Sequence, residues 1–204
     1  LSYFCYSHPS IGCLWFYFVS FGYDVCFVFI SCLTRKKNCF LGGFSFSCDE
    51  GWSIYLTEIF NTKLIGWLEK MDLVYFLSLK DHKEVDYYDI AVVEGVITSE
   101  KDKVEIAKLR AKSKILIAMG TCTITGYPSA QRNNFNEKQN AQIQDHLKQF
   151  DYLPKVLTVT EAVKADAEVM GCPIVEKKFI EVFEKYLNME LMEMTLIDYI
   201  YQNG

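Results

Sequence analysis

Three cysteines in the later part of the chain have side chains that can bind a soft metal. Cys48 follows a short apolar run, Cys122 follows Gly120-Thr121, and Cys172 lies between Gly171 and Pro173. A neighbouring glycine lets the backbone approach a bulky group closely. Thiolates that converge in this way suit a soft metal ion or an iron–sulfur cluster.

Spacing alone favours a simpler interpretation of these cysteines. They are widely separated in the sequence, and such cysteines are far less specific for a metal than a close pair. Cysteine without a disulfide is also among the most buried residue types, so three small core residues would give the same pattern. The spacing favours reduced thiols or metal ligands over a disulfide framework.

The elements that carry these cysteines are predicted as alternating strands and helices. Apolar runs predict strands at residues 39–46, 73–79, 90–93, 115–118 and 156–159, and helical patterns cover 52–68, 100–112, 136–150 and 175–187. Such alternation predicts an α/β domain with an open, mostly parallel sheet and helices on both faces. Functional groups of such a sheet collect beyond the carboxyl ends of its strands, where all three cysteines are predicted to lie.

Local signals support several of these boundaries. Ser99 and Asp102 have the spacing of a capping box that starts a helix. The 90–93 run is flanked by polar residues and has the composition of a strand buried on both faces. Pro173 precedes the last predicted helix, and a proline at a helix start wastes no amide donor.

Composition limits the classes of protein that the chain can represent. Its 204 residues are 50% hydrophobic and 23% charged, which is typical of one folded domain and excludes disorder as a description of the whole. The net charge is −5: residues 1–47 carry a charge of +2, and the remaining residues carry −7. An acidic body of this kind argues against a nucleic-acid partner.

We predict that residues 1–37 form an atypical extension and that residues 38–204 form the α/β domain. The extension is rich in aromatic residues and cysteine and shows no helical or strand periodicity. Residues 11–33 contain one formal charge, Asp24, and precede a basic cluster, so their length matches a membrane span. The mid-span Asp24 and the serines and glycines argue against an anchor and favour a disordered or artefactual extension, so a membrane partner is not expected.

From about residue 38 to residue 187 the chain resembles the small, iron–sulfur subunit of nickel–iron hydrogenases, which is similar to the 20-kDa subunit of NADH:quinone oxidoreductase. The resemblance lies in residues 44–54, 89–95, 115–126 and 171–174, in this order and spacing. It is greatest to the short cytoplasmic branch, because no cysteine follows Cys172.

The resemblance implies a flavodoxin-like domain that holds one 4Fe-4S cluster, the proximal cluster, beside the active site of a large subunit. Cys122 and Cys172 match the family's ligands, and Glu94 lies in a segment that lines the cluster side of the domain. The chain would then be the electron-transfer subunit of a cytoplasmic oxidoreductase and not catalytic alone. Its partners would be a hydrogenase-like large subunit and further iron–sulfur or flavin subunits.

The first motif departs from the family's Cys-x-Gly-Cys pattern. Asp49 and Trp52 stand where the two cysteines are expected, and Cys48 is one residue out of register. Four thiolates normally hold such a cluster, and this part of the chain offers three. Three outcomes remain open: Cys48 joins with Asp49 or another group as fourth ligand, a 3Fe-4S cluster forms, or the cluster is absent.

Other functions follow if the cluster is absent or replaced. A subunit without a cluster would serve structure and interaction in the same kind of complex. The resemblance also leaves open a 20-kDa-type subunit of a quinone oxidoreductase, and a flavodoxin-like flavin carrier is suggested by fold alone. The chain has no Gly-x-Gly-x-x-Gly, so a dinucleotide site is not expected. Glu94 is a candidate for proton movement, or it is a carboxylate that keeps a turn ordered. Arg132 is a candidate for a contact with a partner, or it is an ordinary surface residue. No role is assigned to His8, His82 or His146.

Overall fold

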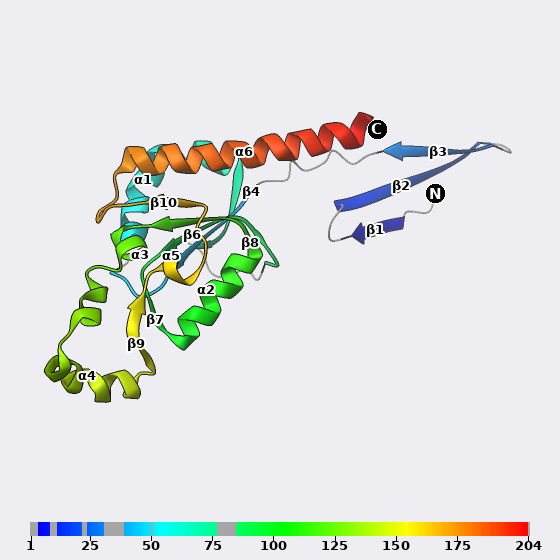
Figure 1. The fold of residues 1–204 in the computed structure, drawn as a ribbon. Coiled ribbons are helices and arrows are strands. Elements are labelled where there is room, and N and C mark those ends of the chain that lie inside the picture. Colours follow the sequence, from blue (N-terminus) through cyan, green and yellow to red (C-terminus); the bar gives the residue numbers. More distant parts are fainter. Residues whose placement is uncertain are drawn as a thin grey trace. The chain divides into compact units, whose positions relative to one another are not determined.

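The computed structural model describes residues 4–8, 12–21, 24–30, 39–49, 51–76 and 85–203. The chain divides into two compact units, Leu1–Lys37 and Asn38–Gly204 (Figure 1). The described part contains no helix that is long and apolar enough to cross a membrane.

The first unit is a small antiparallel sheet. Its strands are β1 (Phe4–His8), β2 (Gly12–Phe21) and β3 (Asp24–Ile30), in the order β1-β2-β3. The expectation that this segment has no regular structure was wrong, because aromatic and β-branched residues suit strands even without alternation. Parts of the apolar stretch at 11–33, namely 11, 22–23 and 31–33, lie outside the described residues.

The second unit contains a five-stranded parallel sheet, as predicted. The strands are β4 (Cys39–Ser45), β5 (Met71–Phe76), β6 (Tyr88–Glu94), β8 (Ser113–Met119) and β10 (Ala167–Val169). Their order is β10-β8-β6-β4-β5, the flavodoxin-like order, in which the direction of winding reverses between β4 and β6. This confirms the predicted fold class.

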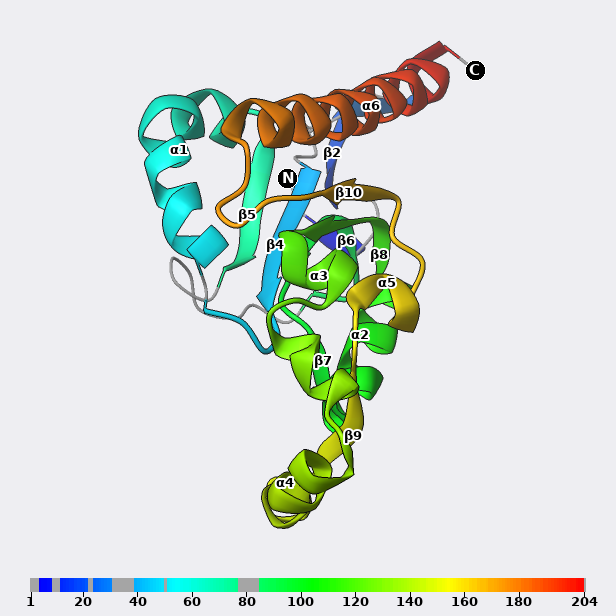
Figure 2. The same cartoon turned by 60° about the vertical axis from the view of Figure 1, so that its left-hand side comes forward.

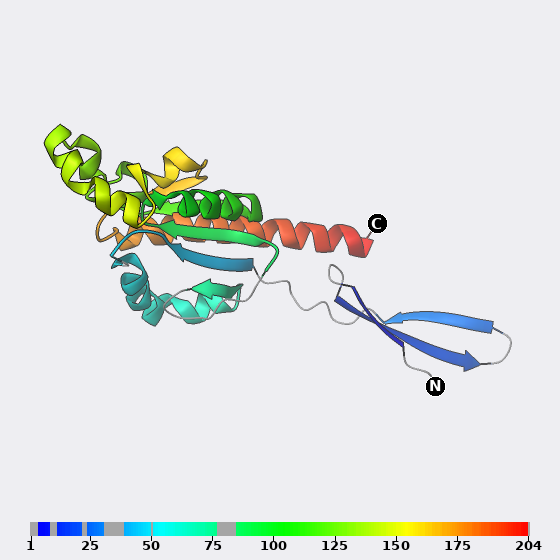
Figure 3. The ribbon, with the colours of Figure 1, turned by 90° about the horizontal axis from the view of Figure 1, so that it is seen from below.

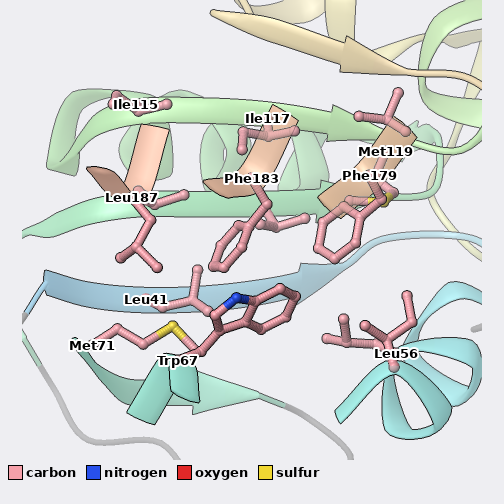
Figure 4. Close-up of a cluster of buried hydrophobic side chains, with 14 of the residues drawn as sticks. Leu41, Leu56, Trp67, Met71, Ile115, Ile117, Met119, Phe179, Phe183 and Leu187 are labelled. Atoms are coloured by element: carbon pink, nitrogen blue, oxygen red, sulfur yellow. The ribbon is translucent and has the colours of Figure 1, made fainter. Parts of the chain in front are cut away.

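Helices cover both faces of this sheet (Figure 2). On one face, α1 (Gly51–Leu68) and α6 (Glu176–Asn203) bury an apolar cluster that includes Trp67, Phe179 and Phe183 (Figure 4). On the other face, α2 (Glu100–Lys112) and α5 (Val159–Ala162) pack on a second cluster. Successive residues of β6 alternate between the two clusters, because side chains of a strand alternate in direction.

The start of α2 has the predicted capping box. The Ser99 hydroxyl accepts a hydrogen bond from the Asp102 amide at 3.1 Å, and the Asp102 carboxylate accepts one from the Ser99 amide at 3.0 Å. These contacts satisfy amide groups that have no partner within the helix.

The last helix is longer than predicted. It begins at Glu176, one residue after the predicted start at 175, and continues to Asn203, past the predicted end at 187. Pro173 lies in the preceding turn, where Gly171 pairs with Ile174. The last α6 residue that is fully buried in the apolar cluster is Leu187, and Leu191 still packs against the cluster. Lys114 then holds the following turns through ion pairs with Glu190 and Glu193.

Between β6 and α5, the segments other than α2 and β8 form a smaller extension beside the parallel sheet. It contains β7 (Ile97–Ser99), α3 (Thr121–Thr125), the 3₁₀ helix η1 (Ser129–Asn134), α4 (Glu137–Gln149) and β9 (Tyr152–Leu157). The strand predicted at 156–159 is therefore β9, which ends at Leu157 and pairs antiparallel with β7 outside the parallel sheet. Its Pro154 suits such a small sheet, because proline donates no ladder hydrogen bond. Figure 3 shows α4 at the end of the unit away from α6.

Candidate functional site

The three predicted cysteines line one pocket beyond the carboxyl ends of β4, β6, β8 and β10. The pocket has a volume of about 200 Å³. Figure 1 shows α3 and the start of α6 at this end of the strands. The side chains and backbone that line it belong to Cys48, Asp49, Gly51, Glu94, Met119, Gly120, Thr121, Cys122, Gly171, Cys172, Pro173 and Ile174.

Cys48 is positioned by the chain that leaves β4. The preceding residue, Ser47, pairs with Val96 through backbone hydrogen bonds of 3.2 and 3.1 Å, and its hydroxyl lies 2.7 Å from that of Thr98. These contacts fix the backbone one residue before the half-buried Cys48. Glu50 and the side chain of Trp52 lie outside the described part of the structure.

Cys122 and Cys172 lie on two loops that are hydrogen-bonded to each other. The amide of Gly120 donates to the carbonyl of Val169 at 2.8 Å, and that of Thr121 donates to the carbonyl of Gly171 at 3.1 Å. Cys122 is half-buried and Cys172 is exposed. The two loops therefore present one inner and one outer thiol to the same space.

Glu94 is the buried carboxylate of the pocket. It is the last residue of β6, it is 3% exposed, and its Oε1 accepts a hydrogen bond from the hydroxyl of Ser45. Ser45 lies directly opposite Glu94 in the β4–β6 register. Ser45 was not among the predicted site residues, although its position at a strand end next to that of Glu94 was the available signal.

Opposing effects act on the pKa of the Cys122 thiol. Burial raises its pKa, and the charge of Glu94 adds to this effect, whereas hydrogen bonds from the backbone at Gly95 and Thr123 favour the thiolate and oppose it. In the absence of a bound metal the net direction is upward. The same backbone donors would stabilise a thiolate that a metal has deprotonated.

Alkylation of the chain without metal should distinguish the inner and outer thiols. Because Cys122 is half-buried and has a raised pKa, we expect iodoacetamide to modify Cys172 first and Cys122 only at a higher pH than an ordinary cysteine requires. Peptide mass spectrometry at several pH values measures both rates. Equal rates at neutral pH would contradict the described positions of the two thiols.

Gly95 allows β4 and β6 to meet at the pocket. Its φ is +92°, and a Cβ atom at this position would lie 2.8 Å from the carbonyl carbon of Phe46. We expect Gly95→Ala to lower the free energy of unfolding by about 1–3 kcal/mol from backbone strain alone, and more from the clash. Thermal and urea unfolding measure this loss.

Gly66 provides the matched control. It lies near the end of α1, and a Cβ atom there would have nothing within 4 Å. We expect Gly66→Ala to stabilise the chain by about 0.5–1 kcal/mol, because alanine loses less backbone entropy in a helix. Equal effects of the two substitutions would argue against the special role of Gly95.

The pocket does not have the geometry of a site for a single metal ion. In the part of the chain that the structure describes, no group of three or more His, Cys, Asp or Glu residues is arranged to hold one ion. Its donors instead surround a space: three thiols and the carboxylates of Asp49 and Glu94. Thiolates and carboxylates both serve as metal ligands in proteins.

Two other residues from the sequence analysis lie away from the pocket. Arg132 donates through Nη2 to the carbonyl of Leu153 at 2.9 Å and lies 5.8 Å from the centre of the Tyr152 ring, so it ties η1 to β9. His146 is exposed on α4, and His82 lies outside the described residues.

Comparison with known proteins gives consistent matches. The profile of the family described as "NADH ubiquinone oxidoreductase, 20 Kd subunit" matches residues 50–186. A subunit of the F420-non-reducing hydrogenase vhu of Methanocaldococcus jannaschii is 28% identical over 154 residues, which cover 69% of this chain and 53% of that protein. The sulfhydrogenase 2 subunit delta of Pyrococcus furiosus is 26% identical over 142 residues, which cover 70% of this chain and 59% of that protein.

A solved structure extends these matches to the fold. A chain of the NAD⁺-reducing [NiFe]-hydrogenase in the H₂-reduced state superposes with a TM-score of 0.57 and 26% identity, covering 67% of this chain and 84% of that chain. The chain spans only about half the length of the curated relatives it matches, 53% and 59% in the two cases above.

Proposed function

Because the chain belongs to the family of the 20-kDa subunit of NADH:ubiquinone oxidoreductase, we propose that it is the electron-transfer small subunit of a cytoplasmic, nickel–iron hydrogenase-like oxidoreductase. Residues 38–204 would carry this function. The observation that carries the proposal is the convergence of Cys48, Cys122 and Cys172 on one pocket.

The residues of the pocket fit an iron–sulfur cluster in donor type and lack one thiolate of the usual four. Cys48, Cys122 and Cys172 would hold it, because soft thiolate ligands are what such clusters take. When bound, a 4Fe-4S cluster supplies reversible one-electron chemistry.

The protein around these thiols would determine the electrostatic environment of the bound group. The backbone at Gly95 and Thr123 donates toward the Cys122 sulfur, and hydrogen bonds to cluster sulfurs are one of the factors that set a reduction potential. The Ser45 hydroxyl holds the Glu94 carboxylate at the inner wall of the pocket. We propose the buried Glu94 carboxylate as the group that relays a proton near the site.

The rim of the pocket supports docking of a large subunit. Two large apolar side chains that adjoin lining residues in the chain are exposed: Met170, before Gly171, is 47% exposed, and Val175, after Ile174, is 60% exposed. Exposed apolar side chains beside a site are suited to contact with a partner. We extend the proposal to a hydrogenase-like large subunit at this rim and to further iron–sulfur or flavin subunits as electron partners.

The experiment that tests this function measures iron and acid-labile sulfide per chain, with electron paramagnetic resonance (EPR), on complex purified without oxygen. We expect about four or about three irons with a matching cluster signal. An intact complex that contains no iron at this subunit would overturn the electron-transfer function.

A second candidate is a subunit of the same kind of complex that serves only assembly. The observation that favours it is the exposed Asp49 in the pocket, where a fourth thiolate would complete the usual set. This alternative predicts a complex that assembles normally without iron in this chain, so the same measurement separates the two functions.

A further inference from the structure

We propose that the Asp49 carboxylate is the fourth ligand of the cluster and that the iron it binds can be removed and replaced. The inference rests on the proposed function, because it requires a cluster in this pocket. It concerns the exposed carboxylate that lines the pocket beside the three thiols.

The pocket has two carboxylates, and their surroundings differ. Glu94 is buried at the inner wall, and its Oε1 accepts the Ser45 hydroxyl. Asp49 is exposed, and in the described residues its only hydrogen bond is the one that its Oδ1 accepts from the Gly51 amide at 3.0 Å. Oδ2 of Asp49 is therefore the carboxylate oxygen of the pocket that is available to a metal.

The backbone around Asp49 leaves room for this carboxylate. A Cβ atom at Gly51 would lie 3.1 Å from Asp49 Oδ1 and 3.6 Å from Oδ2, so a larger residue at 51 would crowd the group. The Gly51 contact also fixes the carboxylate at the start of α1, next to Cys48. Asp49 is thus oriented before any metal binds.

A carboxylate at one corner has a chemical consequence. Carboxylate is a hard ligand and thiolate a soft one, so the iron at the Asp49 corner is held less firmly than the three irons bound by cysteine. One-electron oxidation of the [4Fe–4S]²⁺ cluster would release this iron, giving [3Fe–4S]⁺, Fe²⁺ and one electron. Ferricyanide, the oxidant in the test, takes up that electron and becomes ferrocyanide.

The test compares four forms of the complex: wild type, Asp49→Cys, Asp49→Asn and Glu94→Gln. Asn keeps the oxygen that accepts the Gly51 amide, so it removes the charge without removing the hydrogen bond at the start of α1. Glu94→Gln is the matched control, because it neutralises the other carboxylate of the same pocket. Iron per chain and EPR are recorded before and after one equivalent of ferricyanide.

We expect wild type and Glu94→Gln to go from about four to about three irons and to gain the EPR signal of an oxidised three-iron cluster, which an oxidised four-iron cluster does not give. Added Fe²⁺ and a reductant should restore the fourth iron. Asp49→Cys should keep all its iron and stay silent, and Asp49→Asn should contain about three irons from the start.

Two results would overturn the inference while the proposed function stands. One is a wild-type cluster that keeps all its iron after ferricyanide is added. The other is an Asp49→Asn cluster that behaves as the wild-type cluster does, because the fourth ligand would then be solvent or another residue. A wild-type complex without any cluster would overturn the proposed function and this inference together.

Discussion

Cys122→Ser is expected to abolish or convert the cluster while most of the fold remains. The substitution replaces a soft thiolate by a hydroxyl at the inner wall of the pocket, next to the loop that also positions Cys172. Iron per chain should fall from about four to about three or to none, with loss of the four-iron EPR signal. Circular dichroism and thermal unfolding measure the remaining fold.

Cys39 supplies the control for this experiment. It is completely buried at the first residue of β4, at the amino end of the strand, and is not among the pocket residues. Burial raises the pKa of its thiol strongly, and the charges of Asp89 and Glu190 add to this shift, so it stays protonated. Cys39→Ala should leave the iron content unchanged. Unchanged iron and spectrum in Cys122→Ser would refute its assignment as a ligand.

Phe183→Ala is expected to cause the largest loss of stability. Phe183 is 1% exposed on α6, and its ring lies 4.8 Å from that of Trp67 and 5.5 Å from that of Phe179 (Figure 4). Truncation leaves a cavity between α1, α6 and the sheet, which costs about 3–5 kcal/mol of the free energy of unfolding. Urea unfolding followed by circular dichroism measures the change.

Met192→Ala on the same helix is the comparison for Phe183. Met192 is 73% exposed, so its truncation should change the free energy of unfolding by no more than about 0.5 kcal/mol. A small effect of Phe183→Ala, similar to that of Met192→Ala, would show that α6 does not pack on the sheet as described.

Local signals in the sequence were sufficient for much of the fold. The apolar run at 90–93 predicted a strand buried on both faces, and β6 is buried along its whole length. The Ser99–Asp102 spacing predicted a helix start that the structure reproduces in detail. These features depend on neighbours in the chain, so they can be recognised without knowledge of the tertiary structure.

Other elements could not be predicted locally. The three residues of β10 are too few for a periodic signal, and they form a strand because β8 offers its free edge. The apolar run predicted as a strand at 156–159 gave no sign of its partner: its first residues form the end of β9, which joins β7, because pairing is decided by contacts distant in sequence. The second half of α6 continues past the core, and Lys114, on β8, forms ion pairs there with Glu190 and Glu193 that no local pattern shows.

The sequence by itself determined the residue types of the site and their place at strand ends. Because parallel strands bring their carboxyl ends to one edge, it also predicted that Cys48, Cys122 and Cys172 would meet there. Only the tertiary structure decided which other groups face them. The pairing of Ser45 with Glu94 depends on the register of β4 and β6, which acts through space between segments that local pattern does not connect.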